Sequence, residues 1–363
     1  MAKYNTKELL LIWLDSFSEL SYGEKVSLFD ELKNETSIKS KINSIKTVSP
    51  RLKEKLIALS GVADNSYLSG IIKRMDDFGI TAITKESELY PEELKTIETP
   101  PSVLYCKGNL ELLSGKKFAV VGSRKSLPIS IELTEKYVKA IVDCGFTPVT
   151  GIADGVDGKV LKTAIEINCG AISVFAGGLD MVYPTSNVSL AESVSKSGLI
   201  VSEYPLGVPT KKYSFPLRNR IIAGMSEGVL IVSGGEKSGT VSTGNYAMEY
   251  GKDVFAIPYN VGIQSGKAPN GFIKKGAFLT DEPDDIYDFY GISKKAENVV
   301  LSEDETLIIR LIGDGNEHIE RIAEKLNKSA YEIMPILSLL EIKGQIIQSG
   351  ANKYSLIKTI PEE

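Results

Sequence analysis

The chain has 363 residues, of which 42% are apolar and 25% charged, and its 42 basic and 47 acidic side chains give a net charge of −5. These proportions are ordinary for globular domains and the length suffices for two or three of them, which excludes a disordered or fibrous protein. The mild negative charge argues against a protein that coats nucleic acid through its overall charge, although an average hides local patches.

Residues 1–100 carry apolar side chains at helical spacings and predict a small all-α domain. The positions are Leu9, Leu10, Ile12 and Trp13, then Val26, Phe29 and Leu32, then Leu52, Leu56, Ile57 and Leu59. The pair Pro100-Pro101 ends this segment and forces an extended connection into residues 103–106.

Residues 101–290 change character, because short β-rich apolar runs alternate with helical segments. The runs are 118–121, 146–150, 171–176, 199–202, 228–232 and 254–257. Strands that alternate with helices predict an α/β domain with a mostly parallel sheet covered on both faces.

Residues 291–297 are polar and predict a linker, and residues 298–363 have the outline of a winged helix. Its elements are helices near 304–312, 317–326 and 329–342 and a hairpin formed by 345–348 and 354–357. The third helix has no Lys or Arg before Lys343, so we expect it to contact protein or to have a structural role rather than to read DNA sequence.

Several catalytic and membrane-bound classes are excluded by residue content. His318 is the single histidine and lies far from the glycine-rich region, so histidine-dependent nucleophilic and metal sites are not expected, and we expect His318 at the surface. The three cysteines, Cys106, Cys144 and Cys169, are too widely spaced for a disulfide framework.

No run approaches the roughly 18 apolar residues of a membrane span and no signal peptide is evident, which predicts a cytoplasmic protein without a membrane partner. We expect no catalytic residue, metal or cofactor.

Glycines and hydroxyl residues directly follow four of the predicted strands. The clusters are Gly122-Ser123-Arg124, Thr150-Gly151, Gly177-Gly178, and Gly234-Gly235 with Ser238-Gly239-Thr240. The carboxyl ends of parallel strands meet at one edge of a sheet, where glycines let backbone N–H groups approach an anion and hydroxyls add donors. One such cluster usually marks only a tight turn, but four at one edge predict a phosphate-binding edge.

Two enzyme-like interpretations of this edge are disfavoured. A dinucleotide site would need GxGxxG spacing, which residues 122–124 lack, and an ATPase would need a GxxxxGK[ST] loop, which is absent. Residues 234–240 faintly resemble the PGGxGTxxE motif of nucleotide phosphoribohydrolases, but the carboxylate required after Gly-Thr is missing from 241–244. A regulator that senses a small nucleotide at the same edge stays open as an alternative.

Residues 204–224 form an acid-free basic segment in which Lys211, Lys212, Arg218 and Arg220 are interleaved with the rings of Tyr204, Tyr213 and Phe215. Cations suit the backbone and rings suit the bases of a single-stranded nucleic acid. The alternative is a solvated loop anchored by Phe215. A second basic run, residues 33–55, is better explained as a solvated charged face than as an auxiliary nucleic-acid surface.

With these residues in place, the chain resembles the DprA/Smf family of bacterial DNA-processing proteins. The motifs that carry the resemblance occur in family order: Tyr90-Pro91, Pro100-Pro101, Leu104-Tyr105, Val120-Val121-Gly122-Ser123-Arg124, Gly151-Ile152-Ala153, Gly155-Val156-Asp157, Gly177-Gly178-Leu179-Asp180, Tyr183-Pro184, Ser202-Glu203-Tyr204-Pro205, the run FPLRNRIIAG at 215–224, Ser238-Gly239-Thr240 and Gly276-Ala277. The run at 215–224 is the most specific of them. The chain departs from the family pattern at Leu161, where a histidine is usual, at Asp154 and at Tyr259.

The resemblance implies a Rossmann-like domain that binds single-stranded DNA, forms a homodimer and helps to load RecA recombinase onto incoming strands during natural transformation. It implies that Arg124, Arg218 and Arg220 contact phosphates. The other expected DNA-binding residues are Gly122, Ser123, Gly151, Lys211, Lys212, Phe215, Asn219, Ser238, Gly239 and Thr240.

Overall fold

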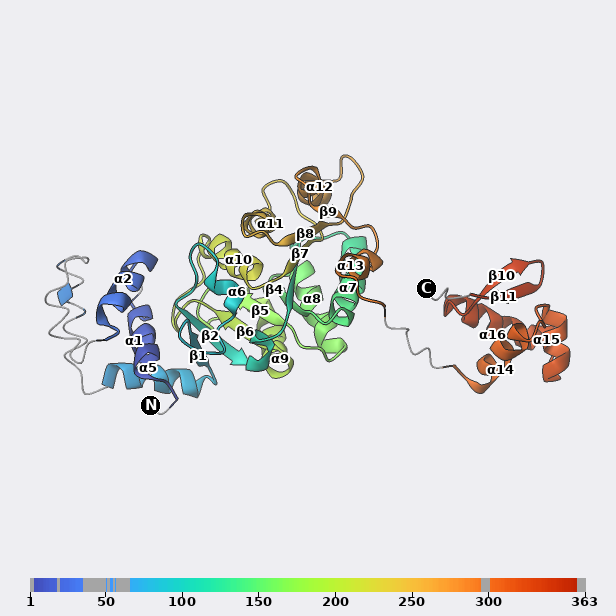
Figure 1. Cartoon of the computed structure of the whole chain (residues 1–363), viewed down its shortest axis with the longest axis horizontal. Helices are drawn as coiled ribbons and strands as arrows, with labels where there is room; N and C mark the ends of the chain where they lie inside the picture. Colours follow the sequence, from blue (N-terminus) through green and yellow to red (C-terminus); the bar gives the residue numbers. More distant parts are fainter. Residues whose placement is uncertain are drawn as a thin grey trace. The chain divides into compact units, whose positions relative to one another are not determined.

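A computed structural model describes residues 3–17, 20–34, 50, 53–54, 56, 66–294 and 301–357 (Figure 1). The chain divides into two compact units, Met1–Lys294 and Lys295–Glu363, which we call unit 1 and unit 2. No helix in the described ranges is long and apolar enough to cross a membrane.

The helical segment of unit 1 consists of α1 (Thr6–Asp15), α2 (Tyr22–Leu32) and α5 (Ser66–Asp77). Helices α1 and α2 each begin with a capping box, in which the cap residue and a glutamate three positions later satisfy each other's backbone N–H groups. The segment is anchored to the sheet, because the Tyr105 hydroxyl donates to Asp15 Oδ2 at 3.0 Å. The helix expected near 52–59 and most of the basic run at 33–55 lie outside the described residues.

Unit 1 is built on one nine-stranded sheet in the order β1-β2-β6-β5-β4-β3-β7-β8-β9. The strands are β1 (Thr81–Thr84), β2 (Val103–Gly108), β3 (Lys117–Val121), β4 (Thr147–Thr150), β5 (Ile172–Phe175), β6 (Leu199–Ser202), β7 (Gly228–Ile231), β8 (Asp253–Ala256) and β9 (Phe278–Leu279). The strands from β6 through β9 in this order are parallel, whereas β1 and β2 join antiparallel. The six predicted strands and the mostly parallel α/β fold are confirmed.

Two edge strands depart from the sequence expectation. Strand β1 lies inside 1–100, which was expected to be wholly helical, and it pairs with β2 from Thr81 opposite Cys106 to Thr84 opposite Val103. Its sequence, Thr-Ala-Ile-Thr, has neither strict alternation nor a run of apolar residues, so β1 is recognised only through its partner. Strand β9 has two residues, which are too few to carry a sequence signal.

Helices cover both faces of the sheet (Figure 1). They are α6 (Glu92–Lys95), α7 (Pro128–Asp143), α8 (Val156–Glu166), α9 (Val188–Ser197), α10 (Ser214–Gly224), α11 (Gly239–Glu249), α12 (Lys267–Lys274) and α13 (Asp284–Tyr290). Alternate residues of β3 show the two layers: Val121 shares a core with Ile222 of α10, while Val120 shares one with Val138 of α7.

The strand order reverses at β3, which lies between β4 and β7. From β3 the chain continues to one side through β4, β5 and β6, and then returns to the other side with β7. In doubly wound sheets the ligand site lies beyond the carboxyl ends of the strands at such a switch point. The fold therefore places the loops after β3 and β7 side by side.

Unit 2 contains α14 (Glu303–Gly313), α15 (Ile319–Leu326), α16 (Ala330–Ile342) and an antiparallel hairpin of β10 (Ile346–Gly350) and β11 (Lys353–Leu356). Its own core includes Ile308, Ile322 and Leu337. These three helices and the hairpin were predicted, and His318 is exposed as expected. Residues 295–297 of the expected linker lie outside the described residues.

Candidate nucleic-acid interface

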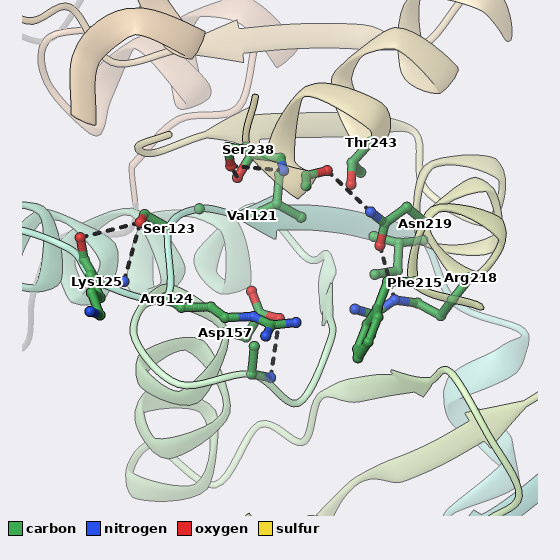
Figure 2. Close-up of a pocket in the computed structure, with 15 residues that line it drawn as sticks. Val121, Ser123, Arg124, Lys125, Asp157, Phe215, Arg218, Asn219, Ser238 and Thr243 are labelled. Carbon is green, nitrogen blue, oxygen red and sulfur yellow. Dashed lines mark hydrogen bonds between the residues drawn. The ribbon is translucent and has the colours of Figure 1, made fainter. Parts of the chain in front are cut away.

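A pocket of about 440 Å³ opens at the switch point, and we call it the switch-point pocket (Figure 2). Nine of the predicted residues line it: Gly122, Ser123, Arg124, Phe215, Arg218, Asn219, Ser238, Gly239 and Thr240. They come from the loop after β3, from α10 and from the start of α11. The structure thus brings together glycine clusters and a basic helix that are about 100 residues apart in the chain.

The loop after β3 is held by contacts that leave no room for larger residues. A Cβ on Gly122 would lie 2.4 Å from Val156 Cγ2 of α8. The backbone N–H of Ser123 donates to Ser233 Oγ at 3.1 Å, and Ser126 Oγ lies 3.0 Å from the same oxygen. Ser233 was not among the predicted site residues, although it directly precedes the glycines of the cluster at 234–235. Ser233 therefore fixes the position of the loop after β3, and this loop carries Arg124, the residue after Ser123.

Arg124 is exposed and stacks on a ring at the mouth of the pocket. Its guanidinium carbon lies 5.0 Å from the centroid of the Phe215 ring, a cation–π distance. The Tyr183 ring is 6.1 Å from Phe215 and is half exposed. Tyr183 was not predicted as a site residue, although its Tyr-Pro pair belongs to the family motifs. Lys125, which was not predicted as a site residue, is also exposed and lines the pocket. Two cations and the Phe215 ring therefore form the accessible side of the pocket, and Tyr183 lies beside that ring.

Arg218 forms the floor of the pocket and is buried. Its Nε donates to Asn219 Oδ1 at 2.9 Å and its Nη1 donates to the carbonyl oxygen of Val174. Figure 2 shows Arg124 and Arg218 extending from opposite sides toward Asp157. Burial raises the pKa of the Asp157 carboxyl, and the positive charge of Arg218 opposes that shift.

Gly151 lies beside this buried pair and does not line the pocket. A Cβ at Gly151 would stand 2.4 Å from both Arg218 Nη1 and Asp157 Oδ2. The sequence predicted Gly151 as a donor to phosphate, whereas the structure gives it a spatial role: only glycine leaves room for the arginine and the carboxylate.

The N-terminus of α11 closes the other side of the pocket. Ser238 caps this helix, because its Oγ accepts from the Thr240 N–H at 3.1 Å. Gly239 is exposed, and nothing lies within 4 Å of the position that its Cβ would take. Asn219 Nδ2 donates to the Gly239 carbonyl oxygen at 3.1 Å and thereby joins α10 to α11. The start of a helix carries a partial positive charge, which favours an anion here.

Three predicted basic residues lie outside the switch-point pocket. Arg220 follows Arg218 by two positions on α10, and because an α-helix turns about 100° per residue the two side chains point to opposite sides. Arg220 is ion-paired with Glu203 at a second cavity, which Lys211 also lines, and Lys212 is exposed but lines neither. The acid-free segment thus offers less free charge than its sequence suggests, because Arg220 is ion-paired with Glu203 and Arg218 is buried near Asp157.

The three departures from the family pattern do not line the pocket. Leu161 belongs to α8 and is fully buried in the core that this helix shares with α9. Asp154 is exposed. Tyr259 is structural: its hydroxyl donates to the Val232 carbonyl oxygen at 3.0 Å and lies 2.7 Å from Ser130 Oγ, which ties the end of β7 to the start of α7.

The fold and the pocket define a doubly wound α/β protein whose ligand site lies at the topological switch point. Residues 81–291 match the family model described as DNA recombination-mediator protein A. The chain is 33% identical over 277 residues to protein Smf of Escherichia coli, covering 73% of this chain and 74% of that protein. It is 36% identical over 237 residues to DNA processing protein DprA of Bacillus subtilis, covering 64% and 80%. The chain therefore belongs to the DprA/Smf family of DNA-processing proteins.

Solved structures agree with this assignment. DNA processing protein A of Streptococcus pneumoniae superposes with a TM-score of 0.69 at 28% identity, covering 77% of this chain and 97% of that one. DNA processing protein A of Helicobacter pylori gives a TM-score of 0.53 at 28% identity over 58% of this chain and 95% of that one. The structure of that relative was solved to study its single-stranded DNA binding mode.

Proposed function

We propose that this protein binds single-stranded DNA in the switch-point pocket and acts as a recombination mediator rather than as an enzyme. The observation that carries the proposal is the Arg124–Phe215 pair at the mouth of the pocket, beside the exposed start of α11. A guanidinium and a helix N-terminus suit a phosphate, and the partly exposed Phe215 ring suits an unstacked base. The single-stranded DNA binding described for the Helicobacter pylori relative supports the same ligand.

The size of the pocket favours a single strand over a duplex. About 440 Å³ accommodates one nucleotide and not a base pair. In a duplex the faces of the bases are stacked on their neighbours and are not available to the rings of Phe215 and Tyr183. Binding to the duplex would therefore rest on phosphate contacts alone.

The pocket chemistry favours binding over catalysis. Among its lining residues in the described chain, Asp157 is the single carboxylate, and it is buried against Arg218. Cleavage of a glycosidic bond needs a carboxylate in contact with the substrate. We expect no free base to be released from nucleoside monophosphates, and release of base at a rate that depends on the protein would overturn this part of the proposal.

We further propose that the protein protects incoming strands in the cytoplasm and helps RecA to assemble on them. Membership of a family described as recombination mediators supports this role. The test is RecA assembly on strands covered by single-strand-binding protein, followed by fluorescence of labelled RecA. We expect the protein to shorten the lag before assembly, and an unchanged lag would contradict the mediator role.

A homodimer would place two such pockets on one strand, and the free edge of β9 suits this association. Strand β9 ends the sheet, and its Phe278 and Leu279 are both exposed. Open edges with apolar side chains pair readily with a second copy. We expect Leu279→Asp to convert a dimer to a monomer in light scattering, while Leu339→Asp, a similarly exposed leucine of unit 2, leaves the mass unchanged. Dimers in both variants would contradict the assignment of this edge.

Binding to single strands is tested by fluorescence anisotropy with one labelled oligonucleotide, presented alone or annealed to its complement. We expect the single strand to bind about tenfold or more tightly, because stacking adds to the phosphate contacts. Affinity should fall as salt rises, since phosphate contacts release counterions. Equal affinity for both forms would contradict the proposed site.

A further inference from the structure

A second cavity, of about 640 Å³, lies on the other side of α10, and we call it the helical-side cavity. It is lined by residues that follow β6, by the start of β2 and by residues of the segment from α1 to α2. Because β2 runs antiparallel to β6, its start lies beside the end of β6. The cavity therefore opens at the same edge of the sheet as the switch-point pocket, and α10 forms the wall between them.

The helical-side cavity contains buried charges that the proposed DNA site does not use. Glu203 and Arg220 form an ion pair through Oε2 and Nη2, and only 9% of the Arg220 side chain is exposed. The remaining atoms of the same pair, Glu203 Oε1 and Arg220 Nη1, are buried without a hydrogen-bond partner. Buried polar atoms of this kind are rare and require an explanation. A ligand that offers an acceptor next to a donor would satisfy both atoms.

Rings and a cation accompany this donor and acceptor. Tyr22, Tyr204 and Tyr213 line the cavity, and Tyr213 is 60% exposed. Lys211 Nζ lies 5.7 Å from the centroid of the Tyr213 ring and forms no ion pair in the described part of the chain. The Lys211–Tyr213 pair thus repeats the combination of cation and ring that Arg124 and Phe215 make at the other pocket.

A second ion pair completes the chemistry of the cavity without adding net charge. Lys25 of α2 donates to Asp15 Oδ1 at 2.7 Å, and Asp15 also accepts from the Tyr105 hydroxyl. The charges of Asp15, Lys25, Glu203 and Arg220 sum to zero, so Lys211 provides the surplus positive charge. A neutral polar interior with a positive mouth suits a base inside and a phosphate at the entrance.

We propose that the helical-side cavity is a second nucleotide site, which takes one base against the Glu203–Arg220 pair and one phosphate at Lys211. The Watson–Crick edge of each of the four DNA bases presents a donor beside an acceptor, which matches the two unpaired atoms. The nucleotide could belong to a bound single strand that crosses the N-terminal end of α10, and in this case the inference rests on the proposed function. It could also be a free mononucleotide, and in that case the inference does not depend on strand binding. In either case the helical segment supplies one wall of a nucleotide site.

The test blocks the cavity without touching its buried charges. Leu217 lines the cavity and is 43% exposed, so Leu217→Trp fills the space from the surface. Leu307→Trp in unit 2 is the matched control, because Leu307 is also 43% exposed. Each full-length variant is titrated with mononucleotides by calorimetry and with an oligonucleotide series of increasing length by anisotropy.

We expect Leu217→Trp to lower affinity about tenfold for oligonucleotides long enough to reach both sites, and to leave the shortest ones unaffected. Loss of mononucleotide binding in this variant would instead identify the free nucleotide as the source. Behaviour identical to that of Leu307→Trp in both titrations would overturn the proposal. If the wild type binds no oligonucleotide at all, the proposed function fails, and the mononucleotide titration alone decides this inference.

A second variant guards against a folding defect in Leu217→Trp. Tyr213→Ala removes an exposed ring that faces the cavity and should keep the thermal unfolding temperature of the wild type. It should reproduce the loss of affinity for the long oligonucleotides. If a folded Tyr213→Ala variant binds the long oligonucleotides with wild-type affinity, the Tyr213 ring does not stack on a base, and the proposal is overturned.

Discussion

The neighbours of an arginine decide whether its charge is available to bind a ligand, as two arginines of α10 illustrate. Arg218 and Arg220 lie in one basic string, yet each is buried, and each faces a carboxylate from another element, Asp157 and Glu203. Removal of one partner from such a pair leaves an uncompensated buried charge, which is strongly destabilising. These side chains therefore hold the walls of the two pockets in place, whereas the exposed cations are Arg124 and Lys125 at the switch-point pocket and Lys211 at the helical-side cavity.

Gly151→Ala tests the space reserved for Arg218. The added Cβ would lie 2.4 Å from Arg218 Nη1 and from Asp157 Oδ2, so both groups must move. We expect the free energy of unfolding to fall by about 1–3 kcal/mol, the usual cost of overpacking, and single-strand affinity to fall with it. Urea unfolding and anisotropy measure the two effects.

The control for this substitution is Gly70→Ala in α5, where nothing lies within 4 Å of the added Cβ. Alanine in place of glycine inside an exposed helix should stabilise the protein by up to about 1 kcal/mol. Equal stability of Gly151→Ala and Gly70→Ala would show that the floor of the pocket is not packed as described.

Among the secondary-structure elements, the start of α11 is a place where a substitution can change DNA affinity without changing the stability of the protein. Ser238 caps the helix, and Asp and Asn cap equally well. Ser238→Asp should keep the free energy of unfolding within about 0.5 kcal/mol of the wild type. It should lower single-strand affinity about tenfold, because it adds a negative charge where a phosphate is expected.

Ser238→Asn is the matched control, since it keeps the cap and adds no charge. It should retain both stability and affinity. If Ser238→Asp binds as tightly as Ser238→Asn, the start of α11 does not face the phosphate backbone.

Helix α14 carries a pH-dependent contribution to the stability of unit 2. Glu305 accepts from Lys343 Nζ at 2.6 Å and from the Ser302 N–H, and these contacts lower the pKa of its carboxyl below the ordinary 4.5. A lowered pKa means that the ionised form stabilises the folded state above about pH 4.5 and that this stabilisation is lost as pH falls further.

Glu305→Gln should flatten that loss, because the amide keeps the capping box but does not titrate. Hydrogen exchange of the α14 peptide between neutral and acid pH measures the effect. Glu303→Gln, an exposed residue of the same turn, should keep the wild-type pH dependence. A wild-type profile in Glu305→Gln would contradict the role of the Lys343 contact.

In the whole molecule, the parallel sheet and the gathering of several glycine clusters at one of its edges could be predicted, because buried strands and the glycines after them leave local signals. The short edge strands β1 and β9 leave none. The position of Arg220 on the far side of α10 depends on how this helix is rotated about its axis relative to the sheet. Residue types alone do not determine that rotation. Ser233 was missed because a serine beside two glycines is common in turns, and its contact with Ser123 is made across the switch point.

Unit 2 should contribute little to strand binding. Helix α16 has no basic residue from Ala330 to Ile342, while Tyr331 and Ile342 are largely exposed, which suits a protein contact better than phosphates. We expect a chain that ends at Lys294 to bind single strands with unchanged affinity and salt dependence. A shallower salt dependence would show that unit 2 does contact phosphates.

The exposed Arg124 and its ring partner Phe215 are the groups that we propose to bind the strand at the switch point. The most direct measurement is the affinity of Arg124→Ala for a labelled single strand, compared with Lys162→Ala, which removes an exposed charge of α8 outside the pocket. We expect a loss of about tenfold or more for Arg124→Ala and wild-type affinity for Lys162→Ala. Equal affinities in the two folded variants would contradict this proposal.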